Sequence, residues 1–241
     1  ATTVRRQTEA VGAAAVALAE AEVERLERLE RVAPVPRARP ERLVVGADGS
    51  MIALVGGEWA EMKLVSVGEP ASGASGTASG TASGTASGTA SGTASGDART
   101  EALSYFARVD DAETFGRQAL GELHRRGLET AGAVAAVQDG APWLQGFVDL
   151  HRPDALRILD WPHAAEHLHT LSEALFGVGT ARAQRVEQRL RRWLWEEGPR
   201  RVLAIGAGWV RARPELASAV AYFQERQTQL DYPAFRAAGW P

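Results

Sequence analysis

RLVVGADGSMIALVGGEWAEMKLVSVGE, residues 42–69, is the stretch that decides the predicted fold. It contains two runs rich in β-branched and other apolar residues, and the pair Gly56-Gly57 separates them. Adjacent glycines accept the positive φ angles of a tight turn, so the pattern predicts two antiparallel strands joined as a hairpin. An acidic residue, Asp48, lies inside the first run and is followed by Gly49.

A low-complexity segment follows the predicted hairpin. Residues 71–96 read ASGASG and then five copies of TASG. Such small and polar side chains bury too little surface to offset the entropy of ordering, so we expect a disordered loop that interrupts the folded core. The entropy cost of closing a loop rises only with the logarithm of its length, and a stable core therefore tolerates the insertion.

Strand and helix patterns alternate after this loop. TEALSYFARV, residues 100–109, alternates like the third strand of an antiparallel meander. Two further strands are expected at 131–139 and 154–160, and helices at 111–127, at 141–151 and from Pro162 onward. Strands that alternate with helices pair in parallel, so we predict an α/β fold with a mixed five-stranded sheet flanked by helices.

Both ends of the chain are predicted to be helical. Residues 5–32 have the spacing of one long helix, in which Val4, Val11 and Leu18 recur seven apart and Leu26 and Leu29 continue the stripe. Prolines in APVPRARP, residues 33–40, end that helix. We therefore divide the chain into an N-terminal helix with its linker (1–40), a core (41–177) and an all-helical C-terminal block (178–241).

Charge is distributed unevenly along the chain. The 241 residues are 45% hydrophobic and 24% charged, which is typical of a globular protein, and their net charge is −3. Residues 178–241 hold 11 arginines and 6 acidic residues, a net charge of +5, so residues 1–177 carry −8. A positive C-terminal block fits contact with phosphate, but charge alone favours the competing interpretation, a solvated arginine-rich helical surface.

The composition also limits the cellular setting. The sequence has no cysteine, which excludes disulfides and thiolate metal sites. It has no apolar run near the roughly 20 residues that cross a bilayer, and its first residues lack the apolar centre of a signal peptide. We therefore expect a cytoplasmic protein with no membrane partner.

Three aspartates fall at or near the ends of predicted strands. They are Asp48, Asp139 in AVQDGA and Asp160 in RILDWPH. Ligands and ions are usually handled at the strand ends of such sheets, and Mg²⁺ prefers a few carboxylate oxygens together with water. The aspartates are therefore candidate magnesium ligands. The competing interpretation of Asp48 and Asp139 is that each Asp-Gly pair only forms a turn.

A second candidate site is HxxEH in LDWPHAAEHLHT, residues 159–170. On a helix, His163 and His167 lie one turn apart with Glu166 beside them, which is a zinc-peptidase arrangement. The competing interpretation makes the histidines half-buried polar groups beside the apolar stripe of the helix, with Asp160 or Trp161 at its N-cap. His169 is expected on the opposite, solvated face.

Five blocks taken in order make a resemblance to a known family. They are TTVRRQTEAVG (2–12), DGSMIALVGGEWAEMKLVSVGE (48–69), ALSYFARVDDAETFGR (102–117), DGAPWLQGFVDLHRPDALRILDWPHAAEHL (139–168) and QLDYPAFRAAGWP (229–241). Together they resemble bacterial insertion-sequence transposases of the ISKra type. That resemblance implies a DDE enzyme with an RNase H-like core, which would cut and join DNA strands with Mg²⁺ or Mn²⁺.

The resemblance also implies roles for particular residues. Asp48 and Asp139 match the first two catalytic, metal-holding aspartates of the family. Asp160 and His163 match a [Cys/Asp]xxH feature that supports the site. The block from residue 178 onward resembles the insertion that precedes the last catalytic acid, a glutamate in GSGxVES.

The chain ends at Pro241, before the place of that glutamate, and starts after the place of the family's N-terminal DNA-binding region. We therefore expect a chain incomplete at both ends. Its partners would be the element's DNA ends and target DNA, and it would be able to form a homo-oligomer. The alternatives are an inactive remnant that at most binds DNA or a partner, and the zinc peptidase. Candidate phosphate contacts are Arg125, Arg126, Arg185, Arg189 and Arg192.

Overall fold

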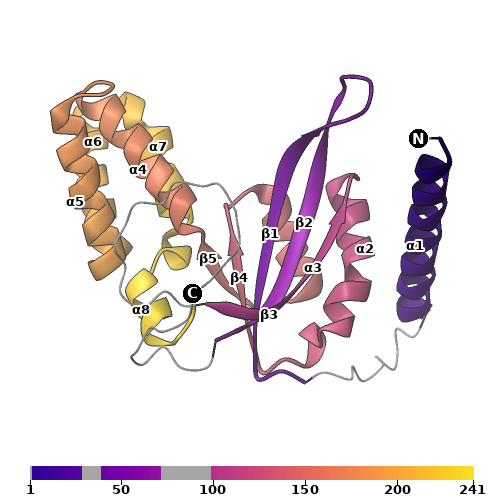
Figure 1. Ribbon diagram of the computed structural model, residues 1–241. Coiled ribbons are helices and arrows are strands. Elements are labelled where there is room, and N and C mark those ends of the chain that lie inside the picture. The colour runs from indigo at the N-terminus through magenta and orange to yellow at the C-terminus, as the bar shows by residue number, and fades with distance from the viewer. Residues whose placement is uncertain (1, 29–38, 72–98) are drawn as a thin grey trace, which may run out of the picture.

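A five-stranded mixed sheet forms the centre of the molecule (Figure 1). The computed structural model describes residues 2–28, 39–71 and 99–241. The strands lie in the order β3-β2-β1-β4-β5, with β1 antiparallel to β2, β2 antiparallel to β3, and β4 parallel to both β1 and β5. They are β1 (Arg42–Ala53), β2 (Trp59–Pro70), β3 (Thr100–Arg108), β4 (Ala133–Gln138) and β5 (Leu156–Leu159). The predicted meander followed by two parallel strands is confirmed.

The predicted hairpin forms as the sequence indicates. Gly56 and Gly57 take φ angles of 111° and 87°, which a side chain would disfavour. The amide of Leu54 closes the turn by donating to the carbonyl of Glu58. The parallel neighbour β4 pairs with β1 only as far as Gly46, so the far half of the hairpin projects beyond the rest of the sheet (Figure 1).

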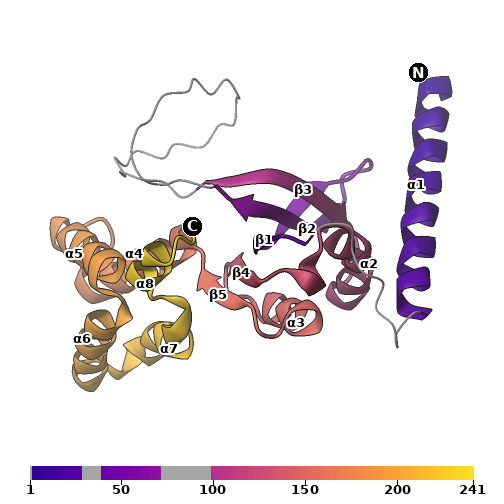
Figure 2. The ribbon, with the colours of Figure 1, turned by 90° about the horizontal axis from the view of Figure 1, so that it is seen from below.

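One face of the sheet is covered by α2 (Ala112–Arg125) and α3 (Pro142–His151), as Figure 2 shows. Leu43 and Val45 of β1 point to this face and meet Phe115 of α2 and Phe147 of α3 in one buried cluster. Asp111 caps α2, because its carboxylate accepts the amides of two residues in the first turn. A short 3₁₀ turn, η1 (Leu128–Thr130), leads from α2 towards β4.

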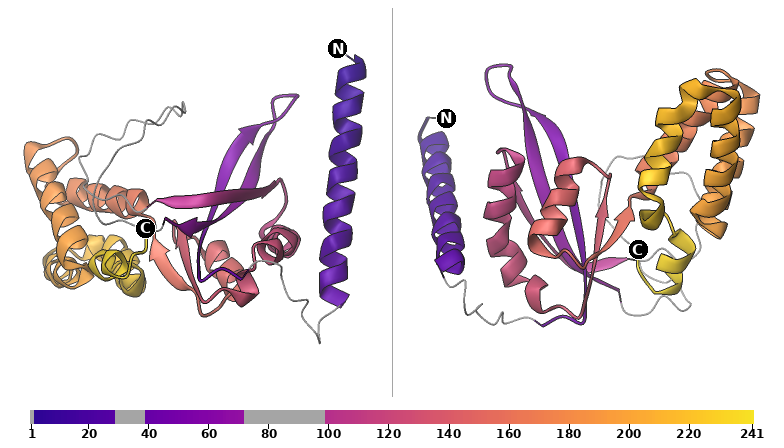
Figure 3. Two further views of the ribbon diagram at one scale, coloured as in Figure 1. Left: turned by 60° about the horizontal axis from the view of Figure 1, so that its bottom comes forward. Right: turned by 180° about the vertical axis from the view of Figure 1, so that it is seen from behind.

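The opposite face packs against the C-terminal helices. Those helices are α4 (Trp161–Phe176), α5 (Ala181–Glu197), α6 (Pro199–Ala212), α7 (Ala217–Glu225) and α8 (Tyr232–Ala237), with 3₁₀ turns η2 (Pro214–Leu216) and η3 (Gln227–Gln229). Val44 of β1 and Ile158 of β5 share one buried cluster with Leu194, Phe223 and residues of all five helices. The predicted helical block therefore shares a core with β1, β4 and β5 and lies on the β5 side of the sheet (Figure 3).

The N-terminal helix α1 (Thr2–Arg28) corrects one detail of the expectation. Its predicted stripe of Val4, Val11 and Leu18 is about 70% exposed. The helix instead contacts α2 through Val23 and Leu26, which are buried, and through an ion pair of Glu27 with Arg117. Leu26, which the prediction put in the same stripe, is buried, so the predicted stripe is confirmed at Leu26 and wrong for the three residues before it. Of the predicted range, Leu29 and the rest up to residue 32 lie outside the described residues.

Two further expectations fall outside what the structure describes. They are most of the TASG loop at 71–96 and most of the proline-rich linker at 33–40. No helix among the described residues is long and apolar enough to cross a membrane.

Candidate functional site

A cavity of about 320 Å³ lies at one end of the sheet, on the face of the helical block. It is formed by β1, β2, β3, the end of β4 and the start of α4. Its polar lining consists of Asp48, Ser66, Thr100, Gln138, Asp139, Asp160 and His163. All three predicted aspartates and His163 therefore border one cavity, although they are spread over more than a hundred residues of sequence.

Asp48 reaches the cavity because strand side chains alternate between faces. Ala47 belongs to the cluster under α2, so Gly46 and Asp48 face the cavity. One Asp48 oxygen, Oδ1, accepts the amide of Gly49 at 2.8 Å. A Cβ at Gly46 would lie 2.8 Å from Ser66 Oγ, so glycine keeps the cavity floor open beside Asp48.

Asp139 follows the last residue of β4 and starts a turn into α3. Its Oδ1 accepts the amide of Ala141 at 2.7 Å, which is the hydrogen bond of an Asx turn. Gly140 has a φ of 84°, and a Cβ there would lie 2.6 Å from Arg226 Nε. The predicted Asp-Gly turn is therefore present, and it places Asp139 on the cavity rim. Turn and site interpretations are compatible here.

Asp160 and His163 enter the cavity from the strand-to-helix junction after β5. The amide of Asp160 donates to the carbonyl of Gln138 at 2.8 Å, which fixes the ends of β4 and β5 side by side. Asp160 occupies the N-cap position of α4, yet its carboxylate caps no amide. Its Oδ2 lies 3.4 Å from His163 Nδ1 instead, an ion pair when the imidazole is protonated.

The donors at this cavity fit a weakly held divalent ion better than a preformed cage. No group of three potential ligand side chains close enough for one metal is present in the described part of the chain. Mg²⁺ and Mn²⁺ accept carboxylate oxygens and retain several waters, so Asp48 and Asp139 are the residues that could hold such an ion at this cavity. No hydrogen bond from a described residue engages the second oxygen of Asp48 or of Asp139.

The structure directs the two histidines of HxxEH to different neighbours. His163 turns to Asp160, whereas the ring of His167 stacks on Tyr222 at 3.5 Å between centroids. Burial lowers the pKa of His167, which favours a neutral, packed ring. Glu166 is exposed. His167 thus takes the half-buried position beside the apolar stripe that the competing interpretation expects.

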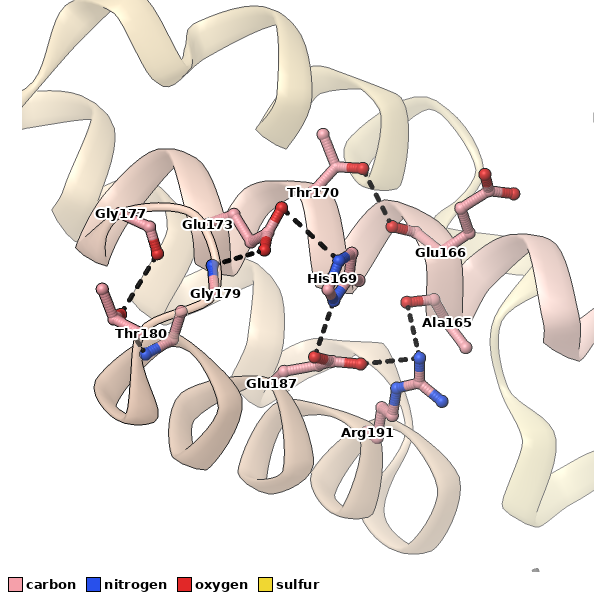
Figure 4. Close-up of polar contacts among 11 residues, drawn as sticks. Ala165, Glu166, His169, Thr170, Glu173, Gly177, Gly179, Thr180, Glu187 and Arg191 are labelled. Carbon is pink, nitrogen blue, oxygen red and sulfur yellow. Dashed lines mark hydrogen bonds and ion pairs between the residues drawn. The ribbon is translucent and has the colours of Figure 1, made fainter. Parts of the chain in front are cut away.

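His169 lies on the other face of α4, as predicted, but it is not simply solvated. Figure 4 shows its ring between Glu187 of α5 and Glu173 of α4. Nδ1 lies 2.8 Å from Glu187 and Nε2 lies 3.4 Å from Glu173. The carboxylate of Glu187, and Glu173 more weakly, raise the pKa of His169. The polar contacts of this face therefore join α4 to α5.

The predicted phosphate contacts fall into two separate groups. Arg125 and Arg126 end α2, before β4 begins, and so lie at the far end of β4 from Asp139. Arg125 is paired with Glu122 at 2.6 Å. The other three arginines lie on the exposed surface of α5, in positions 185, 189 and 192. Only Arg192 of these three has an acidic partner, Glu196 at 3.7 Å, within the described residues.

Besides Ser66, Thr100 and Gln138 of the polar lining, the sequence reasoning missed three residues near the cavity. Tyr222 and Arg226 of the α7 region bond to the backbone of the Asp139 turn, and Pro241 lines the cavity itself. Tyr222 and Arg226 lie more than 80 residues from Asp139 and form no local motif with it, so no spacing rule links them. Pro241 had a signal, because the resemblance puts a catalytic acid directly after this segment.

In comparisons with known proteins, no family model matches the chain, and no curated protein matches it.

Proposed function

We propose that this chain is the catalytic core of a DDE-type transposase of the ISKra kind, which cleaves and joins DNA strands with a divalent metal ion. The observation that carries the proposal is the shared cavity of Asp48, Asp139 and Asp160. The three acids come from β1 and from the ends of β4 and β5, so three strands converge on one site. A chance Asp-Gly turn gives no reason for such convergence.

The sheet supports the RNase H-like part of the proposal. An antiparallel meander followed by two parallel strands, in the order β3-β2-β1-β4-β5, is the arrangement that the resemblance implies. The first acid lies on the central strand β1, and the second follows its parallel neighbour β4. Helices α2 and α3 cover one face, which leaves the acids on the other.

Each residue has a chemical task in this proposal. Asp48 and Asp139 would hold the metal, which supplies an activated oxygen nucleophile and neutralises charge on the phosphodiester. Asp160 would accept a hydrogen bond from the protonated Nδ1 of His163 and so orient the ring. The Nε2 atom of His163 would then be available to accept a proton from the attacking water or 3′-hydroxyl.

The position of Pro241 agrees with the resemblance, which puts the family's third acid directly after this residue. Arg42 holds the preceding residues against the start of β1, because it donates to the carbonyl of Ala238 at 2.9 Å and stacks 3.7 Å over Trp240. Pro241 then lines the cavity. Residues added after Pro241 would start at the cavity, where the family's glutamate is needed.

The exposed arginines of α5 support a DNA partner. Positions 185, 189 and 192 fall on one helix face, and Arg201 covers the ring of the neighbouring Trp193 at 3.9 Å. Guanidinium groups in a row fit the phosphates of a nucleic-acid backbone, and their contribution would fall as salt rises.

The test uses the chain extended at Pro241 by Gly-Ser-Gly-Ala-Val-Glu-Ser, with the same extension carrying Gln for Glu as its control. We expect strand cleavage of the element's terminal DNA with Mn²⁺ or Mg²⁺. Asp48→Asn and Asp139→Asn should each lower the rate by about a hundredfold or more, since each removes charge stabilisation of the reacting phosphate.

Glu166→Gln is the matched control, because Glu166 is an exposed carboxylate close to His163 that the transposase does not use. It should cleave DNA at the normal rate. Full activity of either aspartate variant would exclude the assignment. Metal-dependent peptide cleavage abolished by Glu166→Gln would instead support the zinc peptidase.

A second candidate function is DNA binding without cleavage, as in an inactive remnant. The exposed arginines at positions 185, 189 and 192 of α5 favour it, because they suit phosphate contacts and need no metal site. Salt-sensitive DNA binding by the extended chain, without cleavage in either metal, would select this function over the first.

A further inference from the structure

We propose that Tyr222 and Arg226 are positioning residues that fix the turn carrying Asp139, so that the helical block sets the geometry of the acidic cavity. The catalytic consequence of this inference rests on the proposed function. The positioning itself concerns only the residues of this chain.

Two consecutive carbonyls of the turn accept hydrogen bonds from α7 and the residue that follows it. Tyr222 Oη donates to the carbonyl of Asp139 at 3.1 Å, and Arg226 Nη2 donates to that of Gly140 at 3.0 Å. Both carbonyls lie beyond Gln138, the last residue that β4 pairs with β5. The sheet therefore does not hold these two peptide groups, and the helical block does.

The turn leaves little room for another conformation. Gly140 has its φ at 84°, and a Cβ there would lie 2.6 Å from Arg226 Nε and 3.1 Å from Leu159 Cδ1. On the other side, Asp139 Oδ1 holds the amide of Ala141. The Asp139 carboxylate is thus tied to a backbone segment that is itself held by Arg226 and Tyr222. Loss of the hydrogen bond from Tyr222 or from Arg226 would let the turn at Asp139 and Gly140 move on the side that faces α7.

Tyr222 and Arg226 are themselves held in place by stacking. The Tyr222 ring stacks on His167, at 3.5 Å and 20° between planes, and the Arg226 guanidinium lies 4.2 Å from the ring centre. Arg226 also donates to the carbonyl of Tyr222. Next to them, Phe223 is buried in the core and anchors α7. Three planar groups in a stack lose little further freedom when they bond to the turn.

The same stack links the two segments that carry Asp139 and Asp160. His167 lies on α4, one turn after His163, and α4 begins directly after Asp160. A displacement of α7 would therefore act on the Asp139 turn through Tyr222 and on α4 through His167. DNA bound to the helical block would reach the cavity by this route, which is a short chain of direct contacts.

The first test measures the turn without reference to any reaction. Tyr222→Phe keeps the stacked ring and removes only the hydroxyl, and Tyr105→Phe removes an exposed hydroxyl on β3 as the matched control. Hydrogen exchange of the Ala141 amide should become about five to ten times faster in Tyr222→Phe, as expected for loss of one hydrogen bond, and stay unchanged in Tyr105→Phe. Equal exchange in both variants would overturn the inference.

The second test measures metal binding by Asp139. Mn²⁺ titrated into the full chain should bind several times more weakly to Tyr222→Phe and to Arg226→Lys than to the parent, while their melting temperatures stay close to the parent value. Arg226→Lys keeps the charge but loses the planar group that spans ring and carbonyl. Parent-like Mn²⁺ affinity in both variants would contradict the inference that Tyr222 and Arg226 position the Asp139 carboxylate.

The two proposals fail in different ways. If the parent chain and Asp139→Asn bind Mn²⁺ equally, the metal site of the proposed function is wrong. Faster Ala141 exchange in Tyr222→Phe would still establish the positioning contact. Mn²⁺ binding could instead depend on Asp139 while Ala141 exchange and Mn²⁺ affinity stay unchanged in the Tyr222 and Arg226 variants. The proposed function would then stand and the positioning inference would be wrong.

Discussion

At the residue scale, three histidines face environments with opposite effects on stability. Burial lowers the pKa of His151, whose Nε2 lies 2.9 Å from the carbonyl of Gly116 and whose ring packs on Phe147. Burial lowers that of His167 as well, whereas Glu187 raises that of His169. A lowered pKa means that the folded state disfavours the proton, and a raised pKa means that it favours it.

The pH dependence of unfolding should show both signs. Burial disfavours the protonated form of His151, so the folded state loses stability as pH falls below the unfolded pKa of about 6.5, by at most about 1.4 kcal/mol per pH unit. We expect the free energy of unfolding, measured with urea, to fall less in His151→Gln than in the parent between pH 7.5 and 5.5. In His169→Gln the free energy of unfolding should fall more than in the parent, because protonation of His169 adds stability to the folded state. Parent-like differences in both variants would contradict these environments.

Sequence reasoning succeeded at single residues where a local rule applied. Gly56 and Gly57 predict the hairpin because a tight turn needs positive φ, and Asp139 is found because strand and turn signals meet there. The partners of the Asp139 turn could not be predicted. Tyr222 contacts it across 83 residues, and the packing of α7 against α4 and the sheet brings the two together.

At the element scale, α1 shows a correct helix prediction whose apolar stripe is buried only in part. The spacing of Val4, Val11 and Leu18 is a property of the helix alone, whereas the extent of the buried contact depends on α2. In the structure, Val23 and Leu26 are 2% and 7% exposed, whereas the other three described residues of the predicted stripe are exposed. The Arg117 to Glu27 pair borders the same contact.

This arrangement predicts opposite outcomes for two similar substitutions. Val23→Ala should lower the free energy that holds α1 on α2 by about 1 to 3 kcal/mol, because it removes buried methyl groups. Val11→Ala should change stability by less than about 0.5 kcal/mol, since Val11 is exposed and alanine favours helix. Hydrogen exchange of α1 amides after residue 16 measures both. A larger effect from Val11→Ala would mean that its stripe is the docked face.

At the scale of the whole molecule, the boundary predicted near residue 178 does not divide the hydrophobic core. Val44, Ala135 and Ile158 of the sheet share one buried cluster with Leu194 and Phe223 of the helical block. Tyr232 adds a buried hydrogen bond from its hydroxyl to the carbonyl of Leu159 at 2.8 Å. Sequence composition marks where strands give way to helices, but it carries no information about which surfaces are shared.

A shared core predicts that sheet and helical block unfold together. Phe223→Ala should lower the free energy of unfolding by about 3 to 5 kcal/mol, since Phe223 is among the largest fully buried side chains. The loss should appear at one urea midpoint for tryptophan fluorescence, which four of the seven tryptophans report from the block, and for far-ultraviolet circular dichroism, which reports on all elements. Val178→Ala, at an 83% exposed position, is the control and should leave that midpoint unchanged. Two separate midpoints in the parent would mean that the block folds on its own, and it would then be free to move against the Asp139 turn rather than hold it.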